Sequence, residues 1–62
     1  MKDRELIEQL ELYRLERRLT QREIAKLLQI SFATVNRWFN GRNYPNKIQM
    51  FHITKLIRSK LE

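Results

Sequence analysis

The stretch "LTQREIAKLLQIS", residues 19–31, constrains the fold most strongly, because it holds two helix starts eleven residues apart. Thr20 and Glu23 have the spacing of a capping box, in which the threonine oxygen accepts the amide of the third helical residue and the glutamate accepts the threonine amide. Ser31 can cap a second helix. With only "QIS" between them, the two helices cannot lie antiparallel, so they must cross at a steep angle.

Apolar residues at helical spacing predict one helix before the capping box and define the face of the helix after it. The face over about residues 3–17 consists of Leu6, Ile7, Leu10, Tyr13 and the stem of Arg17. Within residues 21–28, the shared face consists of Ile24, Ala25 and Leu28.

Two further helices are predicted toward the C-terminus. Gly41 favours a left-handed stop after the helix over residues 32–40. Asn46 and Gln49 repeat the capping spacing and predict the start of the last helix. The predicted inward residues of these two helices are Val35, Trp38, Phe39, Met50, Ile53, Thr54, Ile57 and Leu61.

The expected fold class is therefore all-α, a compact four-helix single domain over residues 1–62 with a helix-turn-helix at about residues 20–40. A chain this short buries only roughly 60% of the surface that its unfolded form exposes, so a deep catalytic cleft is not expected. It has no cysteine and one histidine, His52, which we expect to be exposed or half-buried on the last helix. We expect no enzyme, no catalytic residue, no metal and no cofactor.

No apolar run approaches the roughly 18 residues that a membrane span requires. The N-terminal residues "MKDRELIEQ" are charged throughout, unlike a signal peptide. These features predict a cytoplasmic chain with no membrane partner and no small-molecule substrate.

The charge distribution points to a polyanionic partner. The net charge is +6, and six of the seven acids lie in residues 1–23. Residues 24–61 contain no acid and seven basic residues: Lys26, Arg37, Arg42, Lys47, Lys55, Arg58 and Lys60. Positive potential is therefore not cancelled over most of the fold. The alternative explanation for the positive charge is that it keeps a small basic protein soluble.

The helix over residues 32–40 has two chemically different sides. At 100 degrees per residue, Val35, Trp38 and Phe39 point one way. The opposite side carries Ala33, Asn36, Arg37 and Asn40. Amide, guanidinium and methyl groups are those that read adenine, guanine and the thymine methyl in a major groove.

The residues "LTQREIAKLLQISFATVNRWFNGRNYP" resemble the helix-turn-helix of the Xre family, the phage-repressor and Cro-like DNA-binding domains. The resemblance covers residues 10 to about 57 and rests on Leu19-Thr20-Gln21, Ile24-Ala25, Ile30-Ser31, Val35, Trp38, Asn40-Gly41 and Pro45. It implies a lambda-repressor-like fold. It also implies sequence-specific binding of double-stranded DNA in the nucleoid, usually by a homodimer that represses or activates transcription.

The resemblance also implies roles for individual residues. The expected base contacts are Phe32, Ala33, Asn36 and Arg37. The expected phosphate contacts are Gln21, Arg22, Asn40, Arg42, Asn43 and Lys47, with Gln21 also bracing a neighbouring side chain.

The chain departs from the family pattern at two positions near the turn. Gln29 stands where the family often has glycine, so either Gln29 adopts a positive φ or the turn differs. Phe32 stands where a polar base reader is common. Its ring either contacts thymine methyl groups or tucks into the protein.

Some apolar residues lie off the inward stripes, namely Leu12, Leu15, Ile48, Phe51 and Leu56. Either the core has wide apolar faces or some of these residues form a subunit interface. We expect a homodimer interface at Phe51 and Leu56, because one short recognition helix makes few base contacts.

The same sequence features allow other interpretations. The helix-turn-helix could serve as a scaffold for a protein-interaction module, antitoxin-like or adaptor, through the same leucines. RNA binding would require exposed aromatic residues, for which Tyr44 and Phe32 are the candidates. The basic residues near the first helix could pair with its acids or contact phosphate; they are Arg14, Arg17, Arg18 and Arg22.

Overall fold

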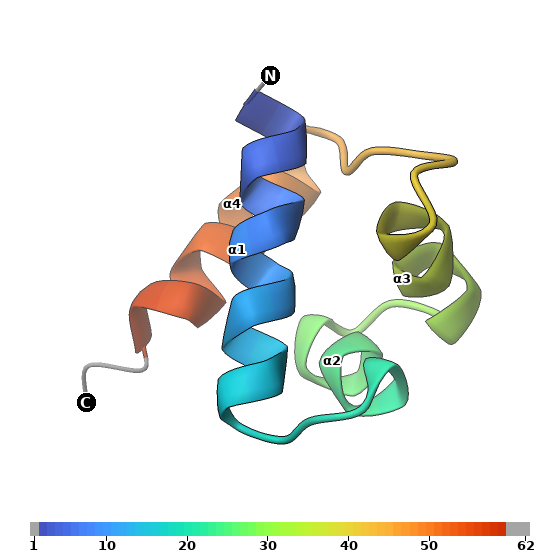
Figure 1. The fold of residues 1–62 in the computed structure, drawn as a ribbon. Helices are drawn as coiled ribbons and strands as arrows, with labels where there is room; N and C mark the ends of the chain where they lie inside the picture. The colour runs from blue at the N-terminus through green and yellow to red at the C-terminus, as the bar shows by residue number, and fades with distance from the viewer. Residues whose placement is uncertain (1, 60–62) are drawn as a thin grey trace.

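The computed structural model describes residues 2–59, with side chains from Arg4 onward, and folds into four helices. These are α1 (Lys2–Glu16), α2 (Gln21–Leu28), α3 (Phe32–Phe39) and α4 (Lys47–Arg58). No strand occurs between residues 2 and 59, so the all-α prediction is confirmed. Figure 1 shows α1 in the middle, with α4 on one side and the α2–α3 pair on the other.

One apolar cluster joins the four helices. Each helix contributes one aliphatic side chain with no exposed surface, and these are Leu10, Ile24, Val35 and Ile53. The buried cluster is completed by Ile7, Tyr13, Ala25 and Trp38. Because α2 and α3 have eight residues each, they are too short to persist alone and depend on this cluster.

The core prediction was right for α3 and partly wrong for α4. Val35, Trp38 and Ile53 are buried, and Phe39 is half-buried against the cluster. Met50 is half-buried and does not belong to the cluster. It lies in the first turn of α4, and so small a domain has few positions that are covered on all sides. Leu61 lies outside the described residues.

Side-chain caps begin α2 and α3 where the sequence predicted them. Thr20 Oγ1 accepts the Glu23 amide at 3.1 Å, and Glu23 Oε1 accepts the Thr20 amide at 2.8 Å. Ser31 Oγ accepts the Thr34 amide at 3.2 Å. These bonds satisfy amides that a helix leaves without partners and fix the two starting points.

The connection from α3 to α4 also follows the predicted pattern. Pro45 is buried, and directly after it Asn46 Oδ1 accepts the Gln49 amide at 2.8 Å. Gln49 Oε1 accepts the Asn46 amide at 2.9 Å, which completes the second capping box. The loop between the helices is therefore anchored at its C-terminal end.

Three helices end in the left-handed conformation. Gln29 has a φ of 59°, which confirms that it takes the strained conformation, and its amide donates to the Lys26 carbonyl at 3.1 Å. Gly41 has a φ of 75° and its amide donates to the Trp38 carbonyl at 3.1 Å. Arg18, at 59°, was not predicted to do so. Only one of the three is glycine, the residue without steric strain in this conformation.

Gly41→Ala and Gln29→Gly should change stability in opposite directions. A Cβ at Gly41 would meet no atom within 4 Å, so its effect is confined to the backbone. We expect Gly41→Ala to lower the free energy of unfolding by about 1 kcal/mol. The left-handed strain destabilises the variant, and the lower entropy of its unfolded chain offsets part of that cost. Gln29→Gly should raise the free energy of unfolding by roughly 0.5 to 1 kcal/mol for the reverse reason. Urea unfolding measures both, and equal stability of Gly41→Ala and the parent would contradict the account.

Candidate nucleic-acid interface

The exposed side of α3 is a continuous face opposite the core. Trp38 is only 2% exposed and Val35 is fully buried, so the helix cannot turn this side inward. The outer face of α3, as we call it below, consists of Phe32, Ala33, Asn36, Arg37 and Asn40. All of them are exposed except Asn36, which is half-buried.

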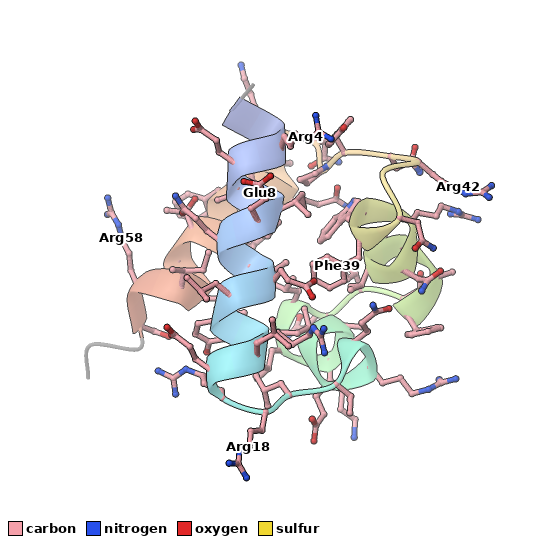
Figure 2. The ribbon with its side chains drawn as sticks, viewed as in Figure 1. Arg4, Glu8, Arg18, Phe39, Arg42 and Arg58 are labelled. Atoms are coloured by element: carbon pink, nitrogen blue, oxygen red, sulfur yellow. The ribbon has the colours of Figure 1, made fainter. Side chains whose placement is uncertain are left out.

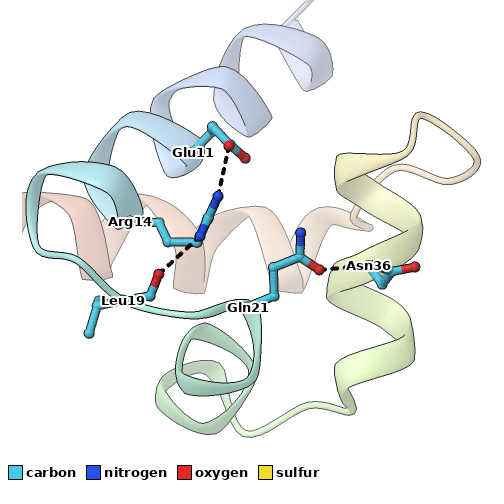
Figure 3. Close-up of polar contacts among 5 residues, drawn as sticks. All are labelled: Glu11, Arg14, Leu19, Gln21 and Asn36. Carbon is cyan, nitrogen blue, oxygen red and sulfur yellow. Dashed lines mark hydrogen bonds and ion pairs between the residues drawn. The ribbon is translucent and has the colours of Figure 1, made fainter.

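A chain of amide side chains links the start of α2 to this outer face (Figure 3). Asn36 Nδ2 donates to Gln21 Oε1 at 2.9 Å, and Asn40 Nδ2 donates to Asn36 Oδ1 at 3.0 Å. Gln21 is the first residue of α2, directly after the Thr20 cap, so the capping box sets its position. Gln21 thus braces a neighbouring side chain as predicted, while its phosphate contact stays a prediction.

The amide chain leaves Asn36 with directed hydrogen-bonding capacity. A carboxamide has two donor hydrogens and two acceptor lone pairs, and Asn36 uses one of each inside the protein. One N–H and one lone pair of Asn36 therefore remain free. In the major groove, adenine offers an acceptor for this N–H and an amino donor for this lone pair. Two hydrogen bonds orient this amide before any partner arrives.

Phe32 and Arg22 form a second contact between α2 and the outer face. The Arg22 guanidinium carbon lies 4.4 Å from the centre of the Phe32 ring, within the range of cation–π stacking. Phe32 is 36% exposed and lies outside the core cluster. The ring is therefore not part of the core, and its contact with thymine methyl groups stays a prediction.

The loop beyond α3 extends the polar surface. Arg42, Asn43 and Tyr44 are exposed there, and Lys47 is exposed at the first position of α4. In Figure 2 the side chain of Arg42 points away from the helices into solvent. From the sequence, Tyr44 was a candidate only for RNA binding, and the structure leaves it exposed beside two predicted phosphate contacts. Its hydroxyl is able to donate to an anion.

The Arg14 guanidinium is hydrogen-bonded to other groups of the protein. Its Nη1 donates to the Leu19 carbonyl at 3.0 Å, and its Nη2 pairs with Glu11 Oε2 at 2.9 Å (Figure 3). Its guanidinium carbon also lies 5.6 Å from the centre of the Phe39 ring. Of the two roles left open for this arginine, the structure shows the intramolecular one, which ties α1 to the turn before α2.

The other arginines near α1 differ in their surroundings. The guanidinium carbon of Arg17 lies 4.8 Å from the centre of the Tyr13 ring, on the same helix. Arg18 is exposed and points away from the body of the protein (Figure 2). Glu23, which directly precedes the acid-free stretch, is already hydrogen-bonded in its capping box.

The described residues offer little for other chemistry. Among residues 2–59 no three His, Cys, Asp or Glu side chains are grouped as a metal site would require. None of the four described helices is long and apolar enough to cross a membrane. His52 is exposed, with its ring 5.6 Å from that of Phe51.

The predicted dimer residues lie on α4 but differ in exposure. Phe51 is 62% exposed and Ile48 is 69% exposed, one turn apart. Leu56 is half-buried and packs against the core cluster, so it has less surface to offer a partner. Leu12 and Leu15 are exposed on α1, as the sequence indicated.

Comparison with known protein families matches residues 10–61 to the family described as helix-turn-helix. No match was found among curated proteins or among solved structures. The matched region contains α2, α3 and the whole amide chain.

The bracing of Asn36 by Gln21 should be measurable without any ligand. In a double-mutant cycle of Gln21→Ala and Asn36→Ala, the coupling in unfolding free energy should be about 0.5 to 1 kcal/mol, the net value of one hydrogen bond. The matched cycle of Gln21→Ala with Arg37→Ala should give a coupling close to zero. Similar couplings in the two cycles would contradict the bracing.

Proposed function

Because the chain belongs to the helix-turn-helix family of Xre and lambda-repressor-like domains, we propose that it is a sequence-specific transcriptional regulator of the repressor type. The family is one of DNA-binding regulatory domains and not of enzymes. In this proposal α3 enters the major groove of double-stranded DNA in the nucleoid of the cytoplasm. The observation that carries it is the outer face of α3, where Asn36 is held by two hydrogen bonds.

The proposed contacts divide into two kinds. Contacts to base edges supply discrimination, and contacts to phosphates supply affinity and register. The proposed base contacts are Phe32, Ala33, Asn36 and Arg37. The proposed phosphate contacts are Gln21, Arg22, Asn40, Arg42, Asn43 and Lys47. With three cations among the latter, affinity should fall with salt with a logarithmic slope of roughly −3 per protomer.

The direct test is selection of bound duplexes from a randomised library, followed by footprinting. The proposal predicts enrichment of one sequence at moderate salt, in two symmetric half-sites. Absence of enrichment over pooled random duplexes would overturn it. That outcome would favour a protein-interaction module that uses exposed leucines such as Leu12 and Leu15.

We place two copies of the chain on each site. A two-turn recognition helix reads few base pairs, and paired half-sites roughly 34 to 36 Å apart are the usual solution. Phe51 and Ile48 present exposed apolar surface on α4. Leu56, on the same helix, is half-buried against the core cluster and contributes less. A twofold axis through this patch would pair it with itself.

Arg37→Ala should weaken binding to the selected duplex by about 1 to 3 kcal/mol and relax preference at one base pair. Arg42→Ala should instead weaken binding to all duplexes alike and reduce the salt slope by about 0.9. Arg58→Ala removes the same charge from α4, and Figure 2 shows Arg58 and Arg42 on opposite sides of the molecule. This variant should bind almost as the parent does. Equal losses for Arg37→Ala on cognate and random duplexes would make Arg37 a backbone contact.

Phe51→Glu should convert the protein from dimer to monomer, because a carboxylate would be desolvated in the apolar contact. Light scattering after size exclusion, at high micromolar protein and without DNA, measures the mass. Leu12→Glu changes a similarly exposed residue on α1 and should leave the dimer intact. A monomeric parent protein under these conditions would rule out the proposed interface.

A further inference from the structure

An aromatic ring on the outer face of α3 requires an explanation. Phe32 is the first residue of α3 and lies outside the core cluster, so the fold does not use its ring as core. The ring instead carries the Arg22 guanidinium at 4.4 Å. A contact of this kind favours one orientation of an aromatic ring at the surface.

The start of α2 holds two side chains of α3 that lie one turn apart. Gln21 accepts a hydrogen bond from Asn36, and the next residue, Arg22, stacks on Phe32. Residues four apart on a helix share a face, so Phe32 and Asn36 point in similar directions. Gln21 and Arg22 of α2 therefore orient the Asn36 amide and the Phe32 ring toward the same side of α3.

The outer face is divided along the helix axis. Its first turn carries Phe32 and Ala33, which are apolar, and its later part carries Asn36, Arg37 and Asn40. In the major groove of a duplex the apolar group that distinguishes one base from another is the C5-methyl of thymine. A cytosine methylated at C5 presents the same group.

We propose that Phe32, positioned by Arg22, reads the C5-methyl group of a pyrimidine next to the base contacted by Asn36. This inference rests on the proposed function, since it concerns duplex bound in the groove by α3. The ring supplies the apolar contact and Arg22 is a positioning residue. The site would accept thymine or 5-methylcytosine and would bind less well to pyrimidines without the methyl.

The magnitude follows from the size of the group. Removing one methyl from an apolar contact should weaken binding about fourfold, from the transfer free energy of one such carbon. Deoxyuridine has the Watson–Crick groups of thymine and lacks only this methyl. Exchanging the two bases therefore tests the contact without altering any hydrogen bond.

The test begins with the duplex enriched by selection and replaces its thymines one at a time by deoxyuridine. With the parent protein, one position in each half-site should lose about fourfold in affinity. At that position cytosine should bind more weakly than 5-methylcytosine by a similar factor. With Phe32→Ala the thymine-to-deoxyuridine ratio there should fall to about one, while helical content stays unchanged because the ring is not in the core.

Two arginine variants separate positioning from charge. Arg22→Ala should lower the thymine-to-deoxyuridine affinity ratio at the same position, which the loss of a phosphate contact alone would not do. Arg17→Ala removes the same charge from another cation–π contact, the one with Tyr13 within α1, and should leave the ratio unchanged.

Three results would overturn the inference while leaving duplex binding intact. One is an absence of any deoxyuridine effect, and another is an unchanged effect in Phe32→Ala. The third is tighter binding of either isolated strand than of the duplex, which would assign the ring to base stacking. Failure of the selection to enrich any duplex would instead overturn the proposed function, so the two failures are distinguishable.

Discussion

Val35 and Trp38 are the buried residues of α3, and they share one cluster with Ile24 and Ala25 of α2. Burial of each large side chain stabilises the fold by about 1.5 to 3 kcal/mol. Rotation of α3 by one residue, 100 degrees, would expose Trp38 and move polar amides toward the core. The direction of every proposed base contact is therefore set by packing on the opposite side of the same helix.

The short turn between α2 and α3 sets how these two helices lie relative to each other. Gln29 adopts the strained left-handed conformation, so that only three residues separate α2 from α3, and the last of them, Ser31, caps the new helix. The two helices then lie close enough for Gln21 to reach Asn36. Because neither helix would persist alone, the outer face exists only while the core is formed. DNA binding and folding stability should therefore be thermodynamically linked.

Local chemistry made most of the fold predictable. The caps at Thr20, Ser31 and Asn46 and the stop at Gly41 depend on residues within one turn of each other, so the sequence revealed them. The outward direction of α3 followed from its two-sided composition. The structure shows this predicted side of α3 opposite the buried Val35 and Trp38.

Contacts between distant residues were not predictable in the same way. The stack of Arg22 on Phe32 joins positions ten apart across a turn, and the partner of Asn36 depends on how two helices cross. Arg14 could equally have faced solvent, and only the folded chain shows it bonded to the Leu19 carbonyl. Side-chain rotamers and crossing geometry decide such contacts, and neither is encoded in spacing along the chain.

The central claim is that the outer face of α3 is the surface that meets the duplex. Amide chemical shifts of the isotope-labelled protein, followed during titration with the selected duplex, test it most directly. The account predicts the largest shifts in α3, at the start of α2 and in the loop around Arg42. Shifts concentrated instead on the exposed side of α4 or on the free face of α1 would contradict it.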